Sequence, residues 1–428
     1  MRPEILAPVG SVEALNAALA AGCDAVYFGL PSFGARAFAN NFDLETTKEV
    51  IERCHLCGVK VYITMNTILY EDEIEDAYNM AKMVHSFGVD ALIIQDLGFI
   101  HLLHHRLPNL VLHASTQLSV SNPYQIEQLK KLGVQRVVLA RECTKEEIQA
   151  CVDTGIEVEV FVHGALCICY SGQCYFSSIH YGRSGNRGMC AQPCRMKYTL
   201  YEDGNKVDTH GEYVLSPKDL SLIDEVNTLA DMGVCSLKIE GRMKSAPYVY
   251  ESVLQVKKVL ENMERNVEDK QNLRVTFNRK YTVGHMYRAS GKELMNSKTC
   301  NHQGIEIGKV VKVNKNKICI QLSQDLHQND GIRFERENLG CHVNFMYDKK
   351  QKLISFMPKN NTVLIEGPSG LHVGSIVRKT MDSELNKTIA EEIRTSNRQS
   401  KVNAIVTCGA VGKPMVMEVY NDSTKISV

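Results

Sequence analysis

The sequence predicts an α/β protein, a (β/α)₈ TIM-like barrel followed by a small antiparallel β-barrel domain. Three observations support this fold class. A helical stretch that ends in Gly and is followed closely by a β-rich apolar run recurs through the first 260 residues. Polar residues gather where these apolar runs end, as they do at the catalytic rim of such a barrel. Beyond residue 272 the pattern changes to short alternating strands with turn signals.

The repeated pattern identifies the eight strands of the barrel. Gly after a helix supplies the left-handed residue that closes it, and a continuous apolar run is typical of a strand buried on both faces. The glycines concerned are Gly22, Gly58, Gly88, Gly133, Gly155 and Gly233. Apolar runs at Ile5–Ala7 and Leu110–His113 complete the set. An open doubly wound sheet is the alternative, but the turn at residues 8–11 lacks the glycine-rich phosphate motif of that fold.

Composition limits where the protein works and what it binds. The 428 residues include 49 basic and 49 acidic side chains, so no global field attracts nucleic acid or anionic membrane. The N-terminus lacks the basic and apolar regions of a signal peptide. No apolar run approaches the roughly 18 residues of a membrane span. We therefore expect a cytoplasmic protein that does not bind membranes.

The longest interruption of the barrel pattern, residues 164–219, is called the cysteine loop below. Its cysteines follow the spacing C-x₆-C-x₁₅-C-x₃-C, at Cys167, Cys174, Cys190 and Cys194. Four thiolates in one loop at a catalytic rim predict a metal site, and an iron–sulfur cluster is the favoured occupant. Zinc is an alternative, although its structural sites use closer pairs; reactive or merely buried thiols are another. Cys169 and Cys235 are spare candidate ligands.

The last strand carries an alternation of charges, Lys238, Glu240 and Arg242. Alternation with a period of two places all three on one side of a strand, facing inward, where charge is costly unless it is paired or used. With His163 at the end of the seventh strand they are the candidate catalytic residues. Arg242 and Lys238 suit carboxylate binding, and Glu240 or His163 suits proton transfer.

The cysteine loop is also locally basic. Between residues 175 and 200 there is no acidic residue, while the cations are Arg183, Arg187, Arg195 and Lys197. These four predict contact with nucleic acid or another anion. The alternative is a solvated loop whose cations screen the negative charge of the cluster.

Five segments, taken together, resemble one known family. They are EVFVHGALC at 159–167, SGQC at 171–174, NRGMCAQPCR at 186–195, LSPKDL at 215–220 and SLKIEGRMKS at 236–245. They are similar to the collagenase-like peptidases of unknown mechanism, family thirty-two of that class, from Ile5 to about Met263. Residues 277–286 and 301–310 resemble the extra domain of the longer members.

That resemblance implies an activity different from the family name. Its well-understood members are prephenate-dependent RNA hydroxylases and ubiquinone-pathway hydroxylases, which carry a [4Fe–4S] cluster on this cysteine pattern. The longer members resemble the enzyme that hydroxylates a cytidine of 23S ribosomal RNA, and a shorter type modifies the wobble uridine of transfer RNA. The resemblance thus implies a [4Fe–4S] cofactor, prephenate as a small dicarboxylate donor, and ribosomal or transfer RNA as partner. The oligomeric state is not predicted.

A peptidase and a non-catalytic cluster-binding scaffold are the rival functions. The sequence contains neither H-E-x-x-H nor G-x-S-x-G. Asp153-Thr154-Gly155 matches the aspartic-protease tripeptide, but it lies at a predicted helix-to-strand junction and has no second copy. We interpret it as a turn.

The sequence as a whole is predicted to divide into three domains. Residues 1–265 are the barrel, 273–395 a β-rich accessory domain, and 396–428 the start of a further β segment, with strands expected at 404–407 and 414–420. We expect the natural protein to continue beyond it. A second basic surface is predicted on the accessory domain, at Lys309, Lys312, Lys315 and Lys317.

Overall fold

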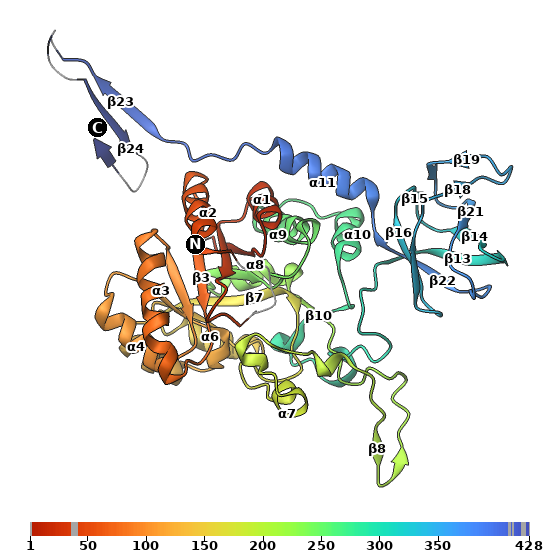
Figure 1. The fold of residues 1–428 in the computed structure, drawn as a ribbon, viewed down its shortest axis with the longest axis horizontal. Coiled ribbons are helices and arrows are strands. Elements are labelled where there is room, and N and C mark those ends of the chain that lie inside the picture. Colours follow the sequence, from red (N-terminus) through yellow and green to blue (C-terminus); the bar gives the residue numbers. More distant parts are fainter. Residues whose placement is uncertain (1, 36–41, 410–411, 413–414, 421–424, 428) are drawn as a thin grey trace.

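The computed structural model describes residues 2–35, 42–409, 412, 415–420 and 425–427. Eight parallel strands close into a barrel because the last of them, β11, pairs with both β1 and β7 (Figure 1). This confirms the predicted (β/α)₈ fold. The strands are β1 (Glu4–Pro8), β2 (Ala25–Gly29), β3 (Lys60–Met65), β4 (Ala91–Ile94), β5 (Leu112–Ala114), β6 (Arg136–Val138), β7 (Glu157–Ala165) and β11 (Ser236–Ile239).

Helices between these strands form the outer layer of the barrel (Figure 1). Several begin at a side chain that accepts a backbone N–H of the first turn, such as Ser11, Asp96 and Thr144. The six glycines of the repeat all have positive φ, as predicted. The helices are α1 (Val12–Ala21), α2 (Leu44–Leu56), α3 (Ile74–Ser86), α4 (Leu97–Arg106), α5 (Pro123–Lys131), α6 (Lys145–Val152), α8 (Val226–Asp231) and α9 (Ala246–Leu260).

The cysteine loop leaves the barrel after β7 and contains the short helix α7 (Phe176–Tyr181) and the hairpin β8 (Tyr201–Glu202) and β9 (Asn205–Lys206). It returns as β10 (Asp219–Ser221), which runs antiparallel to the end of β7. Strand β12 (Tyr281–Thr282) then extends the same sheet beside β10. The helix α10 (Val267–Thr276) packs against α9. The start of the predicted accessory domain, residues 273–304, is therefore largely attached to the barrel.

The accessory domain itself consists of an eight-stranded antiparallel sheet and a two-stranded antiparallel sheet around a separate apolar core. The antiparallel prediction is confirmed, although no pairing in the described residues joins the end strands β17 and β19 into a closed barrel. Its strands are β13 (Ile305–Asn314), β14 (Lys317–Leu322), β15 (Leu326–His327), β16 (Gly331–Phe334), β17 (Leu339–His342), β18 (Met346–Tyr347), β19 (Leu353–Ile354), β20 (Phe356–Met357), β21 (Thr362–Glu366) and β22 (Ile376–Met381).

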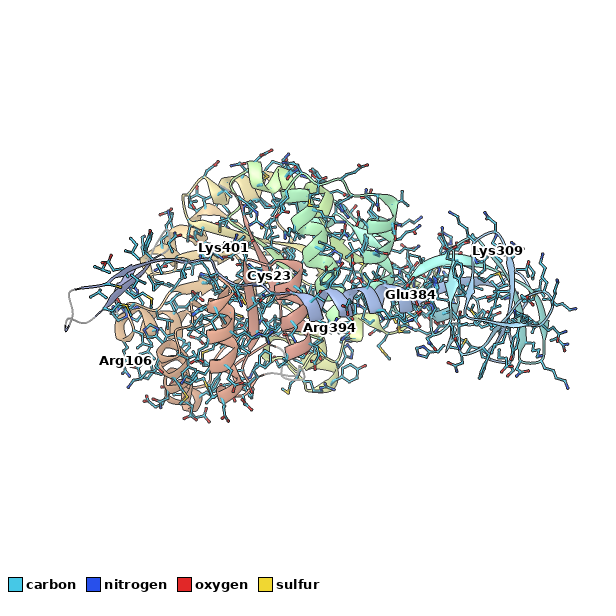
Figure 2. All side chains as sticks on the ribbon, turned by 90° about the horizontal axis from the view of Figure 1, so that it is seen from above. Cys23, Arg106, Lys309, Glu384, Arg394 and Lys401 are labelled. Atoms are coloured by element: carbon cyan, nitrogen blue, oxygen red, sulfur yellow. The ribbon has the colours of Figure 1, made fainter. Side chains whose placement is uncertain are left out.

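The chain then returns to the barrel through α11 (Ser383–Thr395). Figure 2 shows this helix, marked by Glu384 and Arg394, between the accessory domain and the barrel. Ile389 is buried in the barrel core. The Arg398 guanidinium donates to the Cys23 carbonyl oxygen at 2.6 Å. This return segment therefore binds the outer surface of the barrel.

A small antiparallel sheet follows the return segment. It contains β23 (Asn403–Thr407), β24 (Val416–Tyr420) and β25 (Lys425–Ser427). The predicted strand at 414–420 is seen from residue 416, and residue 414 lies outside the described residues. Among the helices that the structure describes, none has both the length and the apolar character needed to cross a bilayer.

Candidate active site

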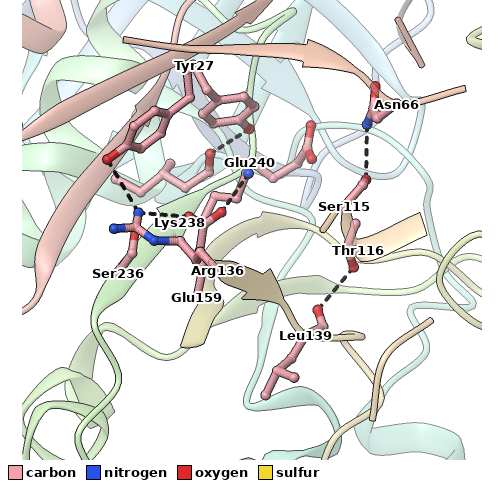
Figure 3. A network of polar contacts seen from close by, with 12 residues as sticks. Tyr27, Asn66, Ser115, Thr116, Arg136, Leu139, Glu159, Ser236, Lys238 and Glu240 are labelled. Atoms are coloured by element: carbon pink, nitrogen blue, oxygen red, sulfur yellow. Dashed lines mark hydrogen bonds and ion pairs between the residues drawn. The ribbon is translucent and has the colours of Figure 1, made fainter. Parts of the chain in front are cut away.

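A polar network fills the interior of the barrel (Figure 3). The Lys238 ammonium lies 2.7 Å from a Glu159 carboxylate oxygen, and Arg136 reaches Glu159 at 3.5 Å and Glu4 at 2.8 Å. Burial lowers the pKa of Lys238, and the Glu159 carboxylate opposes that shift. Lys238 faces inward as predicted. Its charge is held in an internal ion pair, so it is not a free cation for a ligand.

The end of β11 meets the end of β6 at the barrel mouth, the rim formed by the carboxyl ends of the strands. Glu240 pairs with Arg141 at 3.1 Å, and the Arg141 guanidinium lies 4.0 Å over the ring of Phe161. Arg242 donates to the Thr64 hydroxyl at 2.9 Å. Glu240 and Arg242 therefore lie in the predicted region, and each contacts a different strand end.

His163 does not join these charged residues. The register between β7 and β11 shifts so that Lys238 pairs with Phe161 and the next residue, Ile239, pairs with His163. Such a bulge re-aims a side chain. The imidazole lies against Tyr248 of α9 and Tyr281 of β12, outside the ring of strands. Burial lowers the pKa of His163 to about 4, and neither ring nitrogen has a hydrogen-bond partner among the described residues.

The cysteine loop is fixed to the mouth at several strand ends. The Glu142 carboxylate accepts the Ser171 backbone N–H at 3.1 Å, and the Ser171 hydroxyl accepts the Arg141 N–H at 3.2 Å. Further round the rim, Arg187 pairs with Glu73 at 2.5 Å. These contacts hold the loop across the carboxyl ends of the strands, beside Arg141 and Glu240.

Backbone amides surround three of the four predicted ligands in the same way. The Gln192 N–H donates to the Cys190 sulfur at 3.3 Å. The backbone N–H groups of Cys169 and Phe176 approach the sulfurs of Cys167 and Cys174 and lower the pKa of each, but the hydrogen bond to Cys174 and burial raise the pKa of Cys167 overall. Hydrogen bonds to sulfur stabilise thiolates and tune clusters. The loop backbone therefore supplies one N–H donor close to each of these three sulfurs.

The four sulfurs also influence one another. The largest effect on the pKa of Cys174 is a hydrogen bond from Cys167, which lowers it. Electrostatic interaction connects Cys194 with both Cys167 and Cys190. The described residues contain no group of three His, Cys, Asp or Glu close enough to hold one metal ion. A four-iron cluster is wider than one ion and takes one thiolate at each iron, so the donor set fits such a cluster.

The two spare cysteines differ in position. Cys169 lies within the loop, and its electrostatic partners include Cys167 and Cys194. Cys235 precedes β11, and its thiol donates to the Val158 carbonyl oxygen at 3.1 Å. That position is at the amino ends of the strands, opposite the mouth, so Cys235 is remote from the predicted cluster.

The four loop cations are not equivalent. Arg195 points into the structure, where it donates to Ser216 at 2.7 Å and to the carbonyl oxygens of Leu166 and Pro217. Burial lowers its pKa to about 10. The sequence predicts Arg195 as an anion contact, and in this structure its guanidinium donates to Ser216 and to the main chain of the loop. Arg183 and Lys197 are exposed; Arg187 is half-buried beside its Glu73 partner.

Neither Lys244 nor Arg141 is assigned a role in the site from the sequence alone. The Lys244 ammonium lies 2.9 Å from the centre of the Phe277 ring, and burial lowers its pKa to about 8. Lys244 continues the alternation of Lys238, Glu240 and Arg242, and this pattern in the sequence could have indicated it as a further candidate. Arg141 follows an apolar run as other rim residues do, and only the fold shows its ion pair with Glu240.

Comparison with known proteins places this site in a family. Residues 10–296 match the model of peptidase family U32. The chain belongs to peptidase family U32. This confirms the resemblance that the five motifs indicated, and the matched residues include the cysteine loop and every charged residue of the mouth described above.

Three relatives carry names that differ in activity. The 23S rRNA 5-hydroxycytidine C2501 synthase of Escherichia coli is 36% identical over 361 residues, 80% of this chain and 54% of that protein. The tRNA hydroxylation protein P1 of Bacillus subtilis is 40% identical over 61% of this chain and 63% of its own. A protein named collagenase from Porphyromonas gingivalis is 37% identical over 58% and 63%. The chain thus spans a little over half to about two thirds of these relatives.

Proposed function

We propose that this protein is an iron–sulfur RNA hydroxylase, which adds a hydroxyl group to a pyrimidine base with prephenate as oxygen donor. The observation that carries the proposal is the cysteine loop. Its four thiols are held over the mouth of a barrel by the Glu142–Ser171 and Arg187–Glu73 contacts. A cytidine of 23S ribosomal RNA is the first candidate substrate, because the E. coli synthase aligns over 80% of this chain.

Transfer RNA is the alternative substrate of the same chemistry. Relatives from B. subtilis and E. coli are named tRNA hydroxylation proteins, at 40% and 30% identity. The E. coli ribosomal RNA synthase aligns over 361 residues at 36% identity, and the E. coli transfer RNA protein aligns over 347 residues at 30% identity. The higher identity over a similar length favours ribosomal RNA.

The residues of the mouth have separate roles in this proposal. Replacing a base C–H by C–OH is a two-electron oxidation, for which a bound cluster would supply Lewis-acid or redox chemistry. The cluster ligands would be Cys167, Cys174, Cys190 and Cys194. Arg242 contributes a buried cation beside Thr64, and Glu240 a carboxylate that can accept a proton. The base must leave its stack to reach them.

A collagenase-like peptidase is the second candidate, favoured by the name of the P. gingivalis relative. The aspartic-protease tripeptide gives it no support. Asp153 ends α6, and Gly155 has φ 77° immediately before β7. This turn is at the amino ends of the strands, opposite the cysteine loop. A non-catalytic cluster-binding scaffold is the third candidate. It would show neither RNA hydroxylation nor peptide cleavage, which distinguishes it from the other two.

One experiment tests these functions together. The protein is purified without oxygen, its iron and zinc are measured, and it is incubated with prephenate and RNA from a strain that lacks the gene. We expect about four irons per chain and new 5-hydroxycytidine in nucleoside mass spectrometry. New 5-hydroxyuridine instead would identify transfer RNA as the substrate. Colourless protein with one zinc, or gelatin cleavage without RNA oxidation, would contradict the proposal.

A further inference from the structure

Most cations near the mouth are already committed to partners in the protein. Lys238 is paired with Glu159, and Arg187 with Glu73. Arg195 donates to the main chain and to Ser216. Arg242 donates to Thr64 and has further contacts. An anionic ligand of the barrel therefore needs a cation whose donors remain available.

Arg141 meets that requirement. One of its terminal nitrogens donates to Glu240, and its planar group lies over Phe161. Among the described residues, neither Nε nor the other terminal nitrogen of this guanidinium has a hydrogen-bond partner. The side chain is 11% exposed. A nearly buried guanidinium with unused donors suits a carboxylate, which takes two parallel N–H bonds from one such group.

A small apolar cavity adjoins Arg141. Strand β6 ends at Val138, and β10 replaces it along β7: the Leu139 N–H donates to the Glu159 carbonyl oxygen, whereas the Leu222 N–H donates to the Val162 carbonyl oxygen. The cavity lies where one neighbouring strand gives way to the other, and its lining is mainly apolar. Its volume is about 20 Å³, room for a single water molecule, so it holds no part of a larger ligand.

Arg141 is also adjacent to the predicted cluster. Its backbone N–H donates to Ser171 of the cysteine loop at 3.2 Å. Its guanidinium interacts electrostatically with Cys167. A ligand held by Arg141 would therefore lie between the cysteine loop and the barrel interior, where a co-substrate of cluster chemistry belongs.

We propose that Arg141 anchors the carboxylate of a small anionic co-substrate, which displaces Glu240 from the guanidinium. This inference rests on the proposed function, because the co-substrate would be the donor of that reaction. A small carboxylate is favoured over an RNA phosphate because a guanidinium that is 11% exposed beneath a loop is out of reach of a polynucleotide backbone.

The test measures equilibrium binding rather than turnover. Prephenate is titrated into anaerobically purified full-length protein in a calorimeter. Arg141→Met is expected to weaken prephenate binding about tenfold or more. Arg141→Lys should give an affinity between those of wild type and Arg141→Met, because lysine keeps the charge but loses the two parallel N–H donors. Glu240→Gln should tighten binding, because it removes the competing carboxylate. Arg394→Met, an exposed arginine paired with Glu391, is the matched control and should bind normally.

Arg141→Met leaves Glu240 without its partner, so a folding defect needs its own check. The double variant Arg141→Met/Glu240→Gln removes both charges, and iron content and circular dichroism report its integrity. A folded double variant that binds prephenate as tightly as wild type overturns the inference, and so does a loss confined to Arg242→Met. Competition by inorganic phosphate or RNA, but not by other carboxylates, would assign Arg141 to phosphate and overturn it too. RNA oxidation by wild-type protein tests the proposed function separately.

Discussion

Lys238 and Glu159 are both withdrawn from water inside the barrel, with side chains 4% and 0% exposed. A buried ion pair contributes little net stability, but removing one partner leaves an uncompensated charge, which is costly. The inward alternation that suggested a ligand-binding role is therefore also explained by the internal network of Arg136 and Glu4. At the scale of single residues, burial and pairing decide which charges can serve a ligand.

The Lys238 pair gives a stability prediction. Lys238→Met should lower the free energy of unfolding by about 3 kcal/mol, because Glu159 loses its closest cation. Lys238→Met/Glu159→Gln should recover much of that loss. Urea-induced unfolding of the cluster-free protein measures both. A single variant as stable as wild type would show that the pair has no structural role.

Some residue positions were predictable from sequence and others were not. The period of two correctly placed Lys238 inside the barrel, because strand alternation is a local property. The place of His163 at the end of the seventh strand did not predict its surroundings, because one shift in pairing between β7 and β11 turns the imidazole toward Tyr248. Partners depend on register between distant segments, so neither the Glu159 pair nor the Arg141–Glu240 pair could be predicted.

At the scale of elements, the cysteine loop depends on close approach to the barrel. Gly172 has φ 75°, and a Cβ there would lie 2.0 Å from the Gln117 carbonyl oxygen. Gln117 lies in the short turn after β5, and its backbone would have to shift to admit a side chain at residue 172, so glycine is required for this close approach. The sequence motif contained this glycine, but the contact that requires it is visible only in the folded chain.

Gly172→Ala should therefore displace the cysteine loop and lower the iron bound per chain to less than about half. Gly182→Ala is the control, because Gly182 also has positive φ in the same loop but meets nothing within 4 Å. Iron analysis of both variants, purified without oxygen, distinguishes the clash from backbone strain alone. Equal iron in the two variants would contradict the proposed contact.

The interface of α9, α10 and α11 contains a buried acid. Glu251 on α9 is 3% exposed and accepts a hydrogen bond from Gln255 at 3.2 Å. Burial raises its pKa to about 7, and the nearby carboxylates of Asp269 and Glu392 act in the same direction, while Lys258 opposes them. The folded protein consequently binds this proton more tightly than the unfolded chain does.

The sign of the pH dependence follows from that difference. Glu251 contributes stability that is fully present below about pH 4.5 and is lost as pH rises toward 7. Glu251→Gln should remove this dependence and be more stable than wild type at pH 8 by about 3 kcal/mol. Urea unfolding of cluster-free protein at pH 5 and 8 measures the effect. If the free energy of unfolding changes by the same amount between pH 5 and pH 8 in both proteins, the prediction is wrong.

At the scale of the whole molecule, the cations predicted to contact RNA form two groups, one in the cysteine loop and one in the accessory domain. Arg183 and Lys197 project from the cysteine loop, while Lys309, Lys312, Lys315 and Lys317 lie on or between β13 and β14 of the accessory domain. Figure 2 shows Lys309 at the accessory end of the molecule. An RNA that contacts both surfaces would span the barrel mouth and the accessory sheet.

Binding to ribosomal RNA fragments should therefore weaken steeply as salt rises. Changing Arg183 and Lys197 to Gln should reduce the salt slope by about 0.7–0.9 for each phosphate that the variant no longer neutralises. Lys387→Gln/Arg394→Gln on α11 removes two exposed cations elsewhere and is the control. Filter binding over a salt series gives the slopes. An unchanged slope in the first variant would exclude the loop cations from RNA contact.

The return of α11 to the barrel has a consequence for biosynthesis. The docking surface on α1, α2 and α9 is complete once residue 260 has left the ribosome, yet α11 begins only at Ser383. Until the accessory domain has emerged, the pocket for Ile389 and the Cys23 carbonyl that accepts from Arg398 remain open to water. The nascent barrel therefore presents an apolar patch throughout that interval, a natural place for a chaperone to bind.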